Sequence, residues 1–206
     1  MNKEDIAKIL TKNRAVTVNT KDFYIYTSGI KSPIYCDNRL LLAAVEDRKK
    51  IIEAFIKILA DIKFDIAAGV STAGIPWASW IGMATDKPVS YIRAGKKEHG
   101  KKKSIEGADV LNKNIVVIED LITTGKSSLA AVKEVENAGG YPKALVSIFN
   151  YGFKTAEDNF KNANFLVLSL SDFKTLLSVS ECDGDVTQKD TDILRRWHDN
   201  PEAFQL

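Results

Sequence analysis

Short apolar runs alternate with helical patterns through the middle of the chain. Residues 115–118 are four apolar β-branched residues in a row, which is typical of a strand buried on both faces. Elsewhere apolar residues recur every three or four positions, the spacing of a helix with one buried side. Strands are predicted at 66–70, 89–92, 115–118, 144–149 and 164–168, and helices at 46–61, 75–84, 126–138 and 187–199.

This alternation predicts an α/β fold in which a parallel sheet is flanked by helices. Such sheets bind ligands at the carboxyl ends of their strands, so we expect chemistry just after Gly69, Ile92 and Ile118. The N-terminal part has a different pattern and predicts a small subdomain over about residues 1–40, beside a core over about residues 41–206. Its short antiparallel strands are predicted at 16–18, 23–26 and 34–36.

Composition and charge argue against several classes of protein. The 206 residues suit one domain, and the net charge of +2 gives no overall field that favours nucleic acid or a membrane surface. Cys36 and Cys182 have no CxxC spacing, so we expect two free thiols in a reducing compartment. No apolar run approaches the about 20 residues that span a bilayer, and the charged N-terminus does not resemble a signal peptide. We therefore expect a cytoplasmic protein.

Residues 119–127 follow the strongest strand pattern and open a helix. The free N–H groups and positive dipole end of a helix N-terminus suit a phosphate, and Gly125 lets the backbone approach it closely. The carboxylates of Glu119 and Asp120 would repel a phosphate but can accept hydrogen bonds from sugar hydroxyls, so the segment predicts a sugar-phosphate site. Two other interpretations compete with it. A nucleotide-binding P-loop lacks its first glycine here, because Asp120 stands there, and an ordinary helix capped by Thr124 requires no ligand.

Four apolar residues, two acids, two more apolar residues and Thr-Thr-Gly resemble the signature with which type I phosphoribosyltransferases bind phosphoribosyl pyrophosphate (PRPP). The resemblance implies the core fold of that family with a small N-terminal hood. It also implies that Glu119 and Asp120 hold the ribose 2′- and 3′-hydroxyls while the following loop cradles the 5′-phosphate. The implied PRPP-binding residues of this segment are Glu119, Asp120, Leu121, Ile122, Thr123, Thr124, Gly125, Lys126 and Ser127.

A lysine-rich stretch at residues 93–107 follows the strand predicted at 89–92. A solvated charged loop is the simplest interpretation of such a run. However, Gly95 and Gly100 bracket it and permit a moving lid over the ligand-binding edge. Cations there would stabilise the charge of a departing pyrophosphate, and a closed lid would exclude water.

Arg-x-x-x-Lys-x-His-Gly followed by Ile-Glu-Gly resembles the catalytic loop of orotate phosphoribosyltransferases. The resemblance implies that Lys97 and His99 are catalytic and stabilise the pyrophosphate and the transition state, with Arg93 and Lys96 supporting them in PRPP binding. In that family the loop reaches into the partner subunit's active site, so a homodimer with shared sites is implied. The other histidine, His198, lies outside these motifs and is interpreted as a structural or surface residue.

Residues 26–37 contain two turns and are either a hairpin of the subdomain or the base-covering segment that they resemble in the orotate enzymes. The second interpretation implies that Ser28 and Lys31 contact orotate together with Thr123. Residues 69–76 resemble the family's pyrophosphate-binding loop, although a plain strand-to-helix turn also explains them.

Two positions depart from the pattern of some family members. Thr72-Ala73 stand where those members carry a tyrosine-lysine pair, and Asn150-Tyr151 stand where they carry an arginine that holds the carboxylate of orotate. Base recognition is therefore assigned to the backbone near Ser28 and to the Thr123 hydroxyl.

The resemblance covers about residues 23–170 and implies a reaction of de novo pyrimidine biosynthesis. A nitrogen of orotate attacks the anomeric carbon of PRPP, giving orotidine 5′-monophosphate and pyrophosphate. Mg²⁺ is implied, bridging PRPP oxygens and not held in a cage of protein ligands. Two alternatives remain open: transfer to a purine base, against which the Ser28 segment and the His99 loop argue, and a PRPP-sensing regulator without catalysis, against which Lys97 argues.

Overall fold

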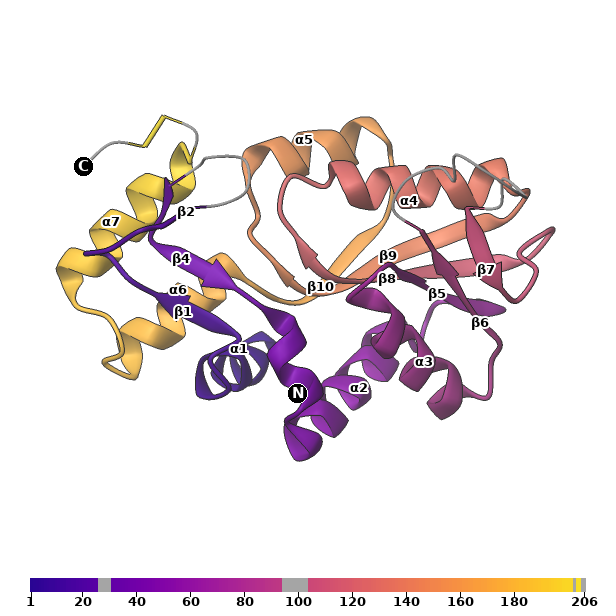
Figure 1. The fold of residues 1–206 in the computed structure, drawn as a ribbon, viewed down its shortest axis with the longest axis horizontal. Helices are drawn as coiled ribbons and strands as arrows, with labels where there is room; N and C mark the ends of the chain where they lie inside the picture. Colours follow the sequence, from indigo (N-terminus) through magenta and orange to yellow (C-terminus); the bar gives the residue numbers. More distant parts are fainter. Residues whose placement is uncertain (26–30, 94–103, 202, 205–206) are drawn as a thin grey trace.

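The computed structural model describes residues 1–25, 31–93, 104–201 and 203–204. A six-stranded sheet of order β10-β9-β8-β5-β6-β7 forms its centre (Figure 1). Neighbouring strands are parallel except β6 and β7, so the prediction of an α/β fold with a mainly parallel sheet is confirmed. The strands are β5 (Ile66–Val70), β6 (Val89–Ile92), β7 (Ile105–Gly107), β8 (Asn114–Ile122), β9 (Tyr141–Asn150) and β10 (Val167–Asp172).

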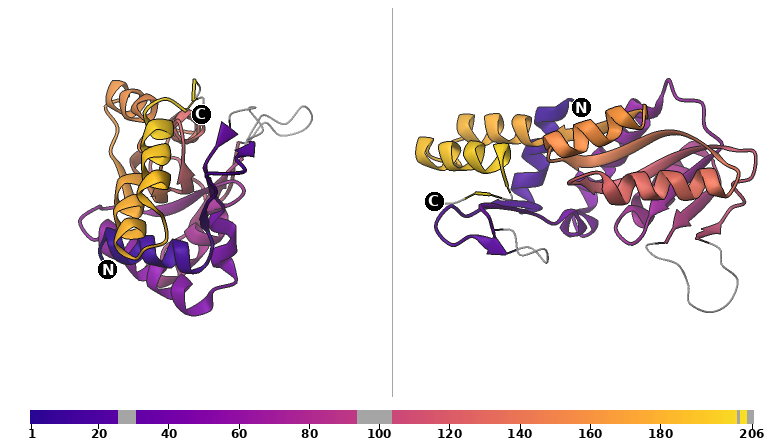
Figure 2. Two further views of the ribbon diagram at one scale, coloured as in Figure 1. Left: turned by 90° about the vertical axis from the view of Figure 1, so that its left-hand side faces the viewer. Right: turned by 90° about the horizontal axis from the view of Figure 1, so that it is seen from above.

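Helices cover both faces of the sheet, with α2 and α3 on one side and α4 and α5 on the other (Figures 1 and 2). Strand β8 contributes to both layers, because Val116 and Ile118 pack in the first core cluster while Ile115 and Val117 pack in the second. The apolar run therefore forms a strand buried on both faces, as predicted. The helices are α2 (Val45–Leu59), α3 (Gly74–Thr85), α4 (Lys126–Asn137) and α5 (Lys154–Asn162).

The N-terminal strands form two small antiparallel pairs beside the main sheet, β1 with β4 and β2 with β3. The C-terminal helix α7 lies against them: Trp197 Nε1 donates a hydrogen bond to the Lys31 carbonyl oxygen at 3.1 Å, and the Phe23 and Phe204 rings are 5.7 Å apart. Segments from both ends of the chain thus form this part of the molecule. Its elements are α1 (Lys3–Lys12), β1 (Val16–Val18), β2 (Tyr24–Ile25), β3 (Lys31–Ser32), β4 (Ile34–Cys36), the 3-10 helix η1 (Asn38–Leu42), α6 (Phe173–Cys182) and α7 (Gln188–Asp199).

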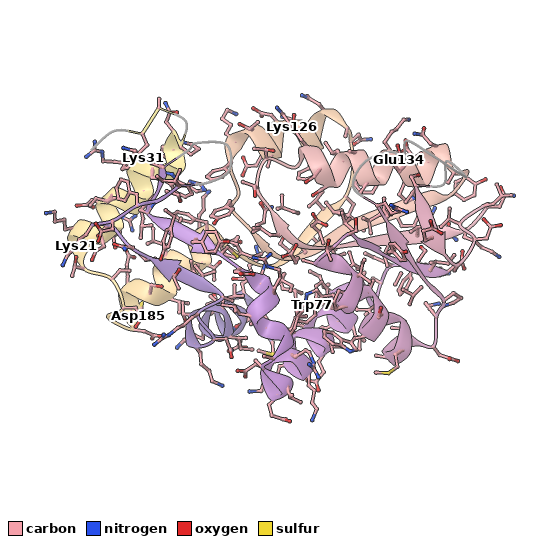
Figure 3. All side chains as sticks on the ribbon, in the orientation of Figure 1. Lys21, Lys31, Trp77, Lys126, Glu134 and Asp185 are labelled. Atoms are coloured by element: carbon pink, nitrogen blue, oxygen red, sulfur yellow. The ribbon has the colours of Figure 1, made fainter. Side chains whose placement is uncertain are left out.

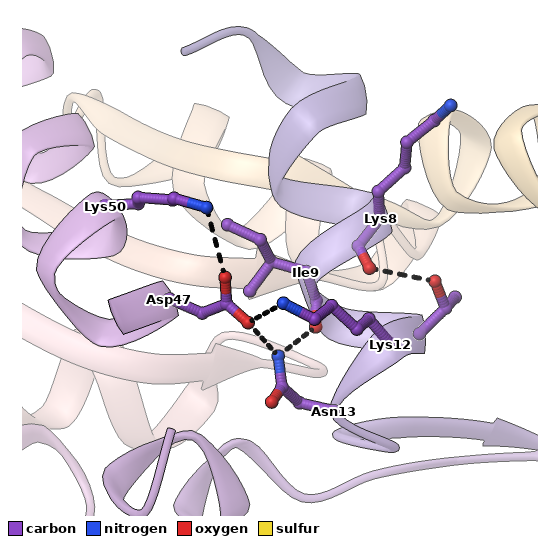
Figure 4. A network of polar contacts seen from close by, with 7 residues as sticks. Lys8, Ile9, Lys12, Asn13, Asp47 and Lys50 are labelled. Atoms are coloured by element: carbon purple, nitrogen blue, oxygen red, sulfur yellow. Dashed lines mark hydrogen bonds and ion pairs between the residues drawn. The ribbon is translucent and has the colours of Figure 1, made fainter. Parts of the chain in front are cut away.

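A buried carboxylate joins α1 to the core helix α2 (Figure 4). Asp47 accepts hydrogen bonds from Lys12 Nζ at 2.8 Å and from Asn13 Nδ2 at 2.9 Å, and Lys50 Nζ lies 3.4 Å away. Asn13 Nδ2 also donates to the Ile9 carbonyl oxygen at 2.9 Å. The hydrogen bonds from Asn13 and Lys12 lower the pKa of Asp47 to about 2, since they stabilise its charged form.

Several elements differ from the predicted ones. The strand predicted at 164–168 begins only at Val167, because Asn164 adopts a left-handed turn with φ of +48°. The apolar pattern does not predict α5, which is short and polar and buries only Ala156 and Phe160, nor does it predict α6. In the part of the chain that the structure describes, every helix is too short or too polar to cross a bilayer.

Candidate active site

The carboxyl ends of β5, β6, β8 and β9 lie along one edge of the sheet, because these four strands are parallel. This geometry brings together residues 71–74 after β5, Arg93 after β6, residues 119–127 at the end of β8, and Asn150 at the end of β9. The segments that the sequence singled out therefore share the edge at which parallel sheets bind ligands.

Two neighbouring carboxyl groups mark the end of β8. Glu119 is only 8% exposed, and burial, reinforced by the Asp120 carboxylate, raises its pKa to about 8. Burial also raises the pKa of Asp120, although the N–H groups of Asp120 and Leu121 and the charge of Arg39 oppose the increase. Two desolvated carboxyl groups at adjacent positions can accept hydrogen bonds from hydroxyl groups of a ligand.

Gly125 is the N-cap residue of α4, with φ of +74°. The capping alternative with Thr124 is therefore not what the structure shows, since the residue at the cap has no side chain. A Cβ atom on Gly125 would lie 2.7 Å from Cζ of Phe160 in α5, so the backbone needs glycine for its conformation and for its close packing. Lys126 and Ser127 are exposed in the first turn of α4, and their N–H groups lie at the positive end of the helix dipole.

The turn after β5 approaches the same strand end. A Cβ atom on Gly74 would collide with the Ile118 carbonyl oxygen, so only glycine lets the start of α3 lie this close to β8. The Ser71 N–H donates to the Ile92 carbonyl oxygen at 2.8 Å, which ties the turn to β6. The Ser71–Thr72 peptide bond is cis.

Arg93 is half-buried where β6 ends. Its N–H donates to the Ser104 carbonyl oxygen at 2.9 Å, and its Nη1 lies 3.7 Å from Glu106 Oε1. These contacts join the described residues on either side of residues 94–103. The predicted residues Lys96, Lys97, His99 and Ser28 lie outside the described residues.

Lys31 lies on β3, in the N-terminal part of the molecule, and its side chain is exposed. Lys31 lies near α7 (Figure 3), whereas Lys126 is the first residue of α4, so these two of the predicted ligand-binding lysines come from different parts of the fold. The backbone of Lys31 has a structural role, since its carbonyl oxygen accepts the hydrogen bond from Trp197 Nε1.

A cavity of about 190 Å³ adjoins the loop after β8, and sequence reasoning missed most of its lining. Thr123 and Thr124 form one wall, Lys154 at the start of α5 contributes to another, and the end of α7 closes it with Trp197 and His198. His198 is a structural residue as interpreted, because its ring stacks on Phe173 with centroids 4.3 Å apart and its Nε2 lies 2.6 Å from the Tyr151 carbonyl oxygen. The sequence carries no signal for the cavity, since α7 follows this loop by some sixty residues.

The departure at Asn150-Tyr151 has a local structural explanation. Asn150 Oδ1 accepts a hydrogen bond from the Gly152 N–H at 2.8 Å and so shapes the turn after β9. Tyr151 is buried and stacks on Phe153 with ring centroids 5.2 Å apart, while Trp197 packs edge-on against it. Tyr151 therefore packs behind Phe153 and Trp197, which line the cavity, while Asn150 shapes the turn that precedes Phe153.

The described side chains offer few ligands for a metal ion. Among the residues that the structure describes, His, Cys, Asp and Glu side chains form no group of three that could hold a metal ion. Glu119 and Asp120 supply carboxylate oxygens, which are the ligands Mg²⁺ prefers, but one or two of these suffice only when a substrate supplies further oxygens.

Comparisons with known proteins agree with this geometry. The sequence profile of a family described as "Phosphoribosyl transferase domain" matches residues 42–161. The orotate phosphoribosyltransferase of Coxiella burnetii is 42% identical over 203 residues, covering 98% of this chain and 97% of that protein. The orotate phosphoribosyltransferase of Staphylococcus epidermidis is 41% identical over 199 residues, covering 96% and 98%. The solved structure of the Aeropyrum pernix orotate phosphoribosyltransferase, 24% identical, has a TM-score of 0.76 over 88% of this chain and 99% of its own, which shows a common fold.

Proposed function

This chain belongs to the orotate phosphoribosyltransferase family, and we propose its function and the roles of its residues on that basis. It transfers the ribose 5-phosphate group of PRPP to orotate and releases pyrophosphate, which makes it a pentosyltransferase of pyrimidine biosynthesis. The observation that carries this conclusion is the identity of 41–42% to two such enzymes over nearly the whole chain. The roles of individual residues are the part that we propose.

In our proposal Glu119 and Asp120 accept hydrogen bonds from the ribose 2′- and 3′-hydroxyls. Their burial supports this role, because a carboxyl group in a site from which water is excluded binds a hydroxyl more strongly than one in solvent. The loop from Thr123 to Ser127 binds the 5′-phosphate through its N–H groups and hydroxyls at the start of α4. Leu121 and Ile122 place this loop directly after the carboxyl pair.

We assign the pyrophosphate to residues around β5 and β6. Arg93, together with Lys96, Lys97 and His99, stabilises the charge that grows as the bond between the anomeric carbon and the pyrophosphate oxygen breaks. Lys97 and His99 are the proposed catalytic residues. The half-buried position of Arg93 at the end of β6 supports this assignment, since it lies on the same sheet edge as the carboxyl pair.

Orotate is proposed to lie beside Thr123, with Ser28 and Lys31 covering it from the N-terminal hood. The nitrogen of the base that forms the new bond must then face the anomeric carbon above Glu119 and Asp120. The cavity next to Thr123, walled by the end of α7, supports a base site on this side.

Mg²⁺ is proposed as the metal cofactor. It would be held by oxygens of PRPP, with Glu119 and Asp120 as the carboxyl groups that we assign to its surroundings. When bound, Mg²⁺ neutralises negative charge on the pyrophosphate.

We further propose a cytoplasmic homodimer in which the lysine-rich stretch completes the partner's site. The free cysteines Cys36 and Cys182 are compatible with a reducing compartment. PRPP and orotate are the proposed partners, with neither nucleic acid nor a membrane.

The test is the loss of the ultraviolet absorbance of orotate in the presence of PRPP and Mg²⁺. We expect a loss that requires PRPP, with pyrophosphate released in equal amount. Adenine in place of orotate serves as the control and should give no pyrophosphate. Binding of PRPP without consumption of orotate would contradict the proposed function.

A further inference from the structure

Two asparagine side chains hold the segment between β8 and α4 from opposite sides. Asn38, at the start of η1, donates its Nδ2 hydrogen bond to the Asp120 carbonyl oxygen at 2.7 Å. Asn159, in α5, donates its Nδ2 hydrogen bond to the Thr124 carbonyl oxygen at 2.9 Å. The two residues are far apart in the sequence, yet each contacts one end of the same five-residue stretch.

The hydrogen bond from Asn38 reaches a carbonyl group of β8 that lies beyond the last residue paired with β5. β5 pairs with β8 only as far as the pair formed by Gly69 and Ile118, and the chain then turns away into α3. Carbonyl groups two residues apart on a strand point to the same side, so the Asp120 carbonyl points like that of Ile118, toward the side that β5 has left. The amide of Asn38, which is 1% exposed, supplies the donor there.

The second bond satisfies a carbonyl that the helix cannot reach. The hydrogen bonds of α4 begin with the Gly125 carbonyl oxygen, which accepts from the Leu129 N–H at 2.9 Å. The Thr124 carbonyl lies one residue earlier and has no donor within α4. Asn159 provides that donor, and the neighbouring Phe160 packs against Gly125.

We propose that Asn38 and Asn159 are positioning residues for PRPP: Asn38 fixes the strand end that presents the ribose-binding carboxyl groups, and Asn159 fixes the loop that binds the 5′-phosphate. This inference rests on the proposed function of residues 119–127. Asn38 also begins η1, directly after β4 of the hood, so it ties the position of the hood to the ribose site.

The roles of Asn38 and Asn159 can be distinguished by comparing the binding of PRPP with the binding of inorganic phosphate. PRPP uses both ends of the segment, whereas inorganic phosphate uses only the loop. Loss of the bond from Asn38 should therefore weaken the binding of PRPP and leave the binding of inorganic phosphate unchanged. Loss of the bond from Asn159 should weaken the binding of both ligands.

The experiment compares Asn38→Leu and Asn159→Leu with Asn13→Leu as the matched control. Asn13, at the end of α1, donates the same kind of bond to the Ile9 carbonyl oxygen at 2.9 Å and also donates to Asp47 in α2, but it makes no hydrogen bond to the segment. Dissociation constants for PRPP come from calorimetry, and those for inorganic phosphate from the dependence of the melting temperature on phosphate concentration.

We expect the PRPP dissociation constant to rise about tenfold in Asn38→Leu and Asn159→Leu, the size expected for a buried carbonyl that loses its donor. The phosphate constant should rise only in Asn159→Leu, and Asn13→Leu should lower the melting temperature while both constants stay unchanged. If a leucine variant does not fold, Asn38→Ala and Asn159→Ala carry the test, because alanine removes the donor and adds no charge beside the phosphate.

Unchanged PRPP binding in both segment variants, or equal weakening in the Asn13 control, would overturn the inference. A wild-type protein that does not bind PRPP at all would instead count against the proposed function. The division of roles would also be overturned if Asn38→Leu weakened the binding of inorganic phosphate as strongly as the binding of PRPP.

Discussion

Replacing Glu119 with glutamine should change how stability depends on pH. The pKa of Glu119 is raised from its ordinary value of 4.5 to about 8, mainly by burial. Between these two values the unfolded chain releases the proton while the folded chain retains it. The unfolded state then binds fewer protons, so the free energy of unfolding falls as pH rises.

The magnitude follows from the width of this window. Each pH unit within it costs about 1.4 kcal/mol, so a window of about 3.5 units costs about 5 kcal/mol by pH 8. Because Glu119 is only 8% exposed, solvent screening reduces this cost little. Glutamine has nearly the same shape and no proton to lose, so Glu119→Gln should escape the cost. The variant should become increasingly more stable than the wild type between pH 5 and pH 8.

Urea denaturation of both proteins at intervals from pH 5 to pH 9, without PRPP, measures this difference. We expect the gap between the two free energies of unfolding to widen with pH and to level off above about pH 8. A gap that stays constant across this range would refute the reasoning and show that Glu119 ionises normally in the folded protein. The same variant should bind PRPP more weakly, because the amide of glutamine offers the ribose hydroxyls one acceptor oxygen and a fixed donor in place of a carboxyl group.

Four further predictions follow from the site and the fold. Lys97→Ala should lower kcat about 100-fold and change the PRPP dissociation constant far less, because its charge acts on the leaving pyrophosphate; steady-state kinetics and calorimetry together check this, and equal losses would contradict it. Lys31→Ala should raise a Michaelis constant, for orotate if it meets the base carboxylate or for PRPP if it meets the pyrophosphate, and unchanged constants for both would remove the residue from the site. Gly125→Ala should raise the KM for PRPP about tenfold or more, because a left-handed alanine costs about 1–2 kcal/mol and its Cβ would meet Phe160; a normal KM would show that the loop tolerates a side chain. Asp47→Asn should lower the free energy of unfolding by about 2 kcal/mol at pH 7 and by little near pH 2, since the lowered pKa of Asp47 gives stability that is present above pH 4 and lost on acidification; chemical denaturation at the two pH values measures it, and a loss of equal size at both would contradict the role of the charge.

Much of the core could be predicted from the sequence because its signals are local. The strands at 66–70 and 89–92 have the bounds that the apolar runs predict, and the run at 115–118 lies within β8. The parallel arrangement then brings the segments after these strands to one edge. Each step depends only on neighbouring residues and on general rules for parallel sheets.

The rest of the site depends on contacts between distant segments, which no local pattern reveals. Asn38 and Asn159 are ordinary polar residues in the sequence, and their amides gain a role only when η1 and α5 meet the end of β8. The cavity wall at Trp197 and His198 arises in the same way, from the packing of α7 beside Thr123. Helix α5 escapes prediction because it buries too few apolar residues to give a helical period.

The hydrogen bond between Trp197 Nε1 and the Lys31 carbonyl oxygen joins residues 166 positions apart. During synthesis on the ribosome, at about 5–20 residues per second, β3 emerges about 10–30 s before its partner in α7. The strands of the hood must spend this time without the helix that covers them, while the parallel core assembles from segments made in between. Chaperones that bind exposed strand edges would therefore find their substrate at the N-terminal end of the nascent chain, and release should coincide with completion of α7.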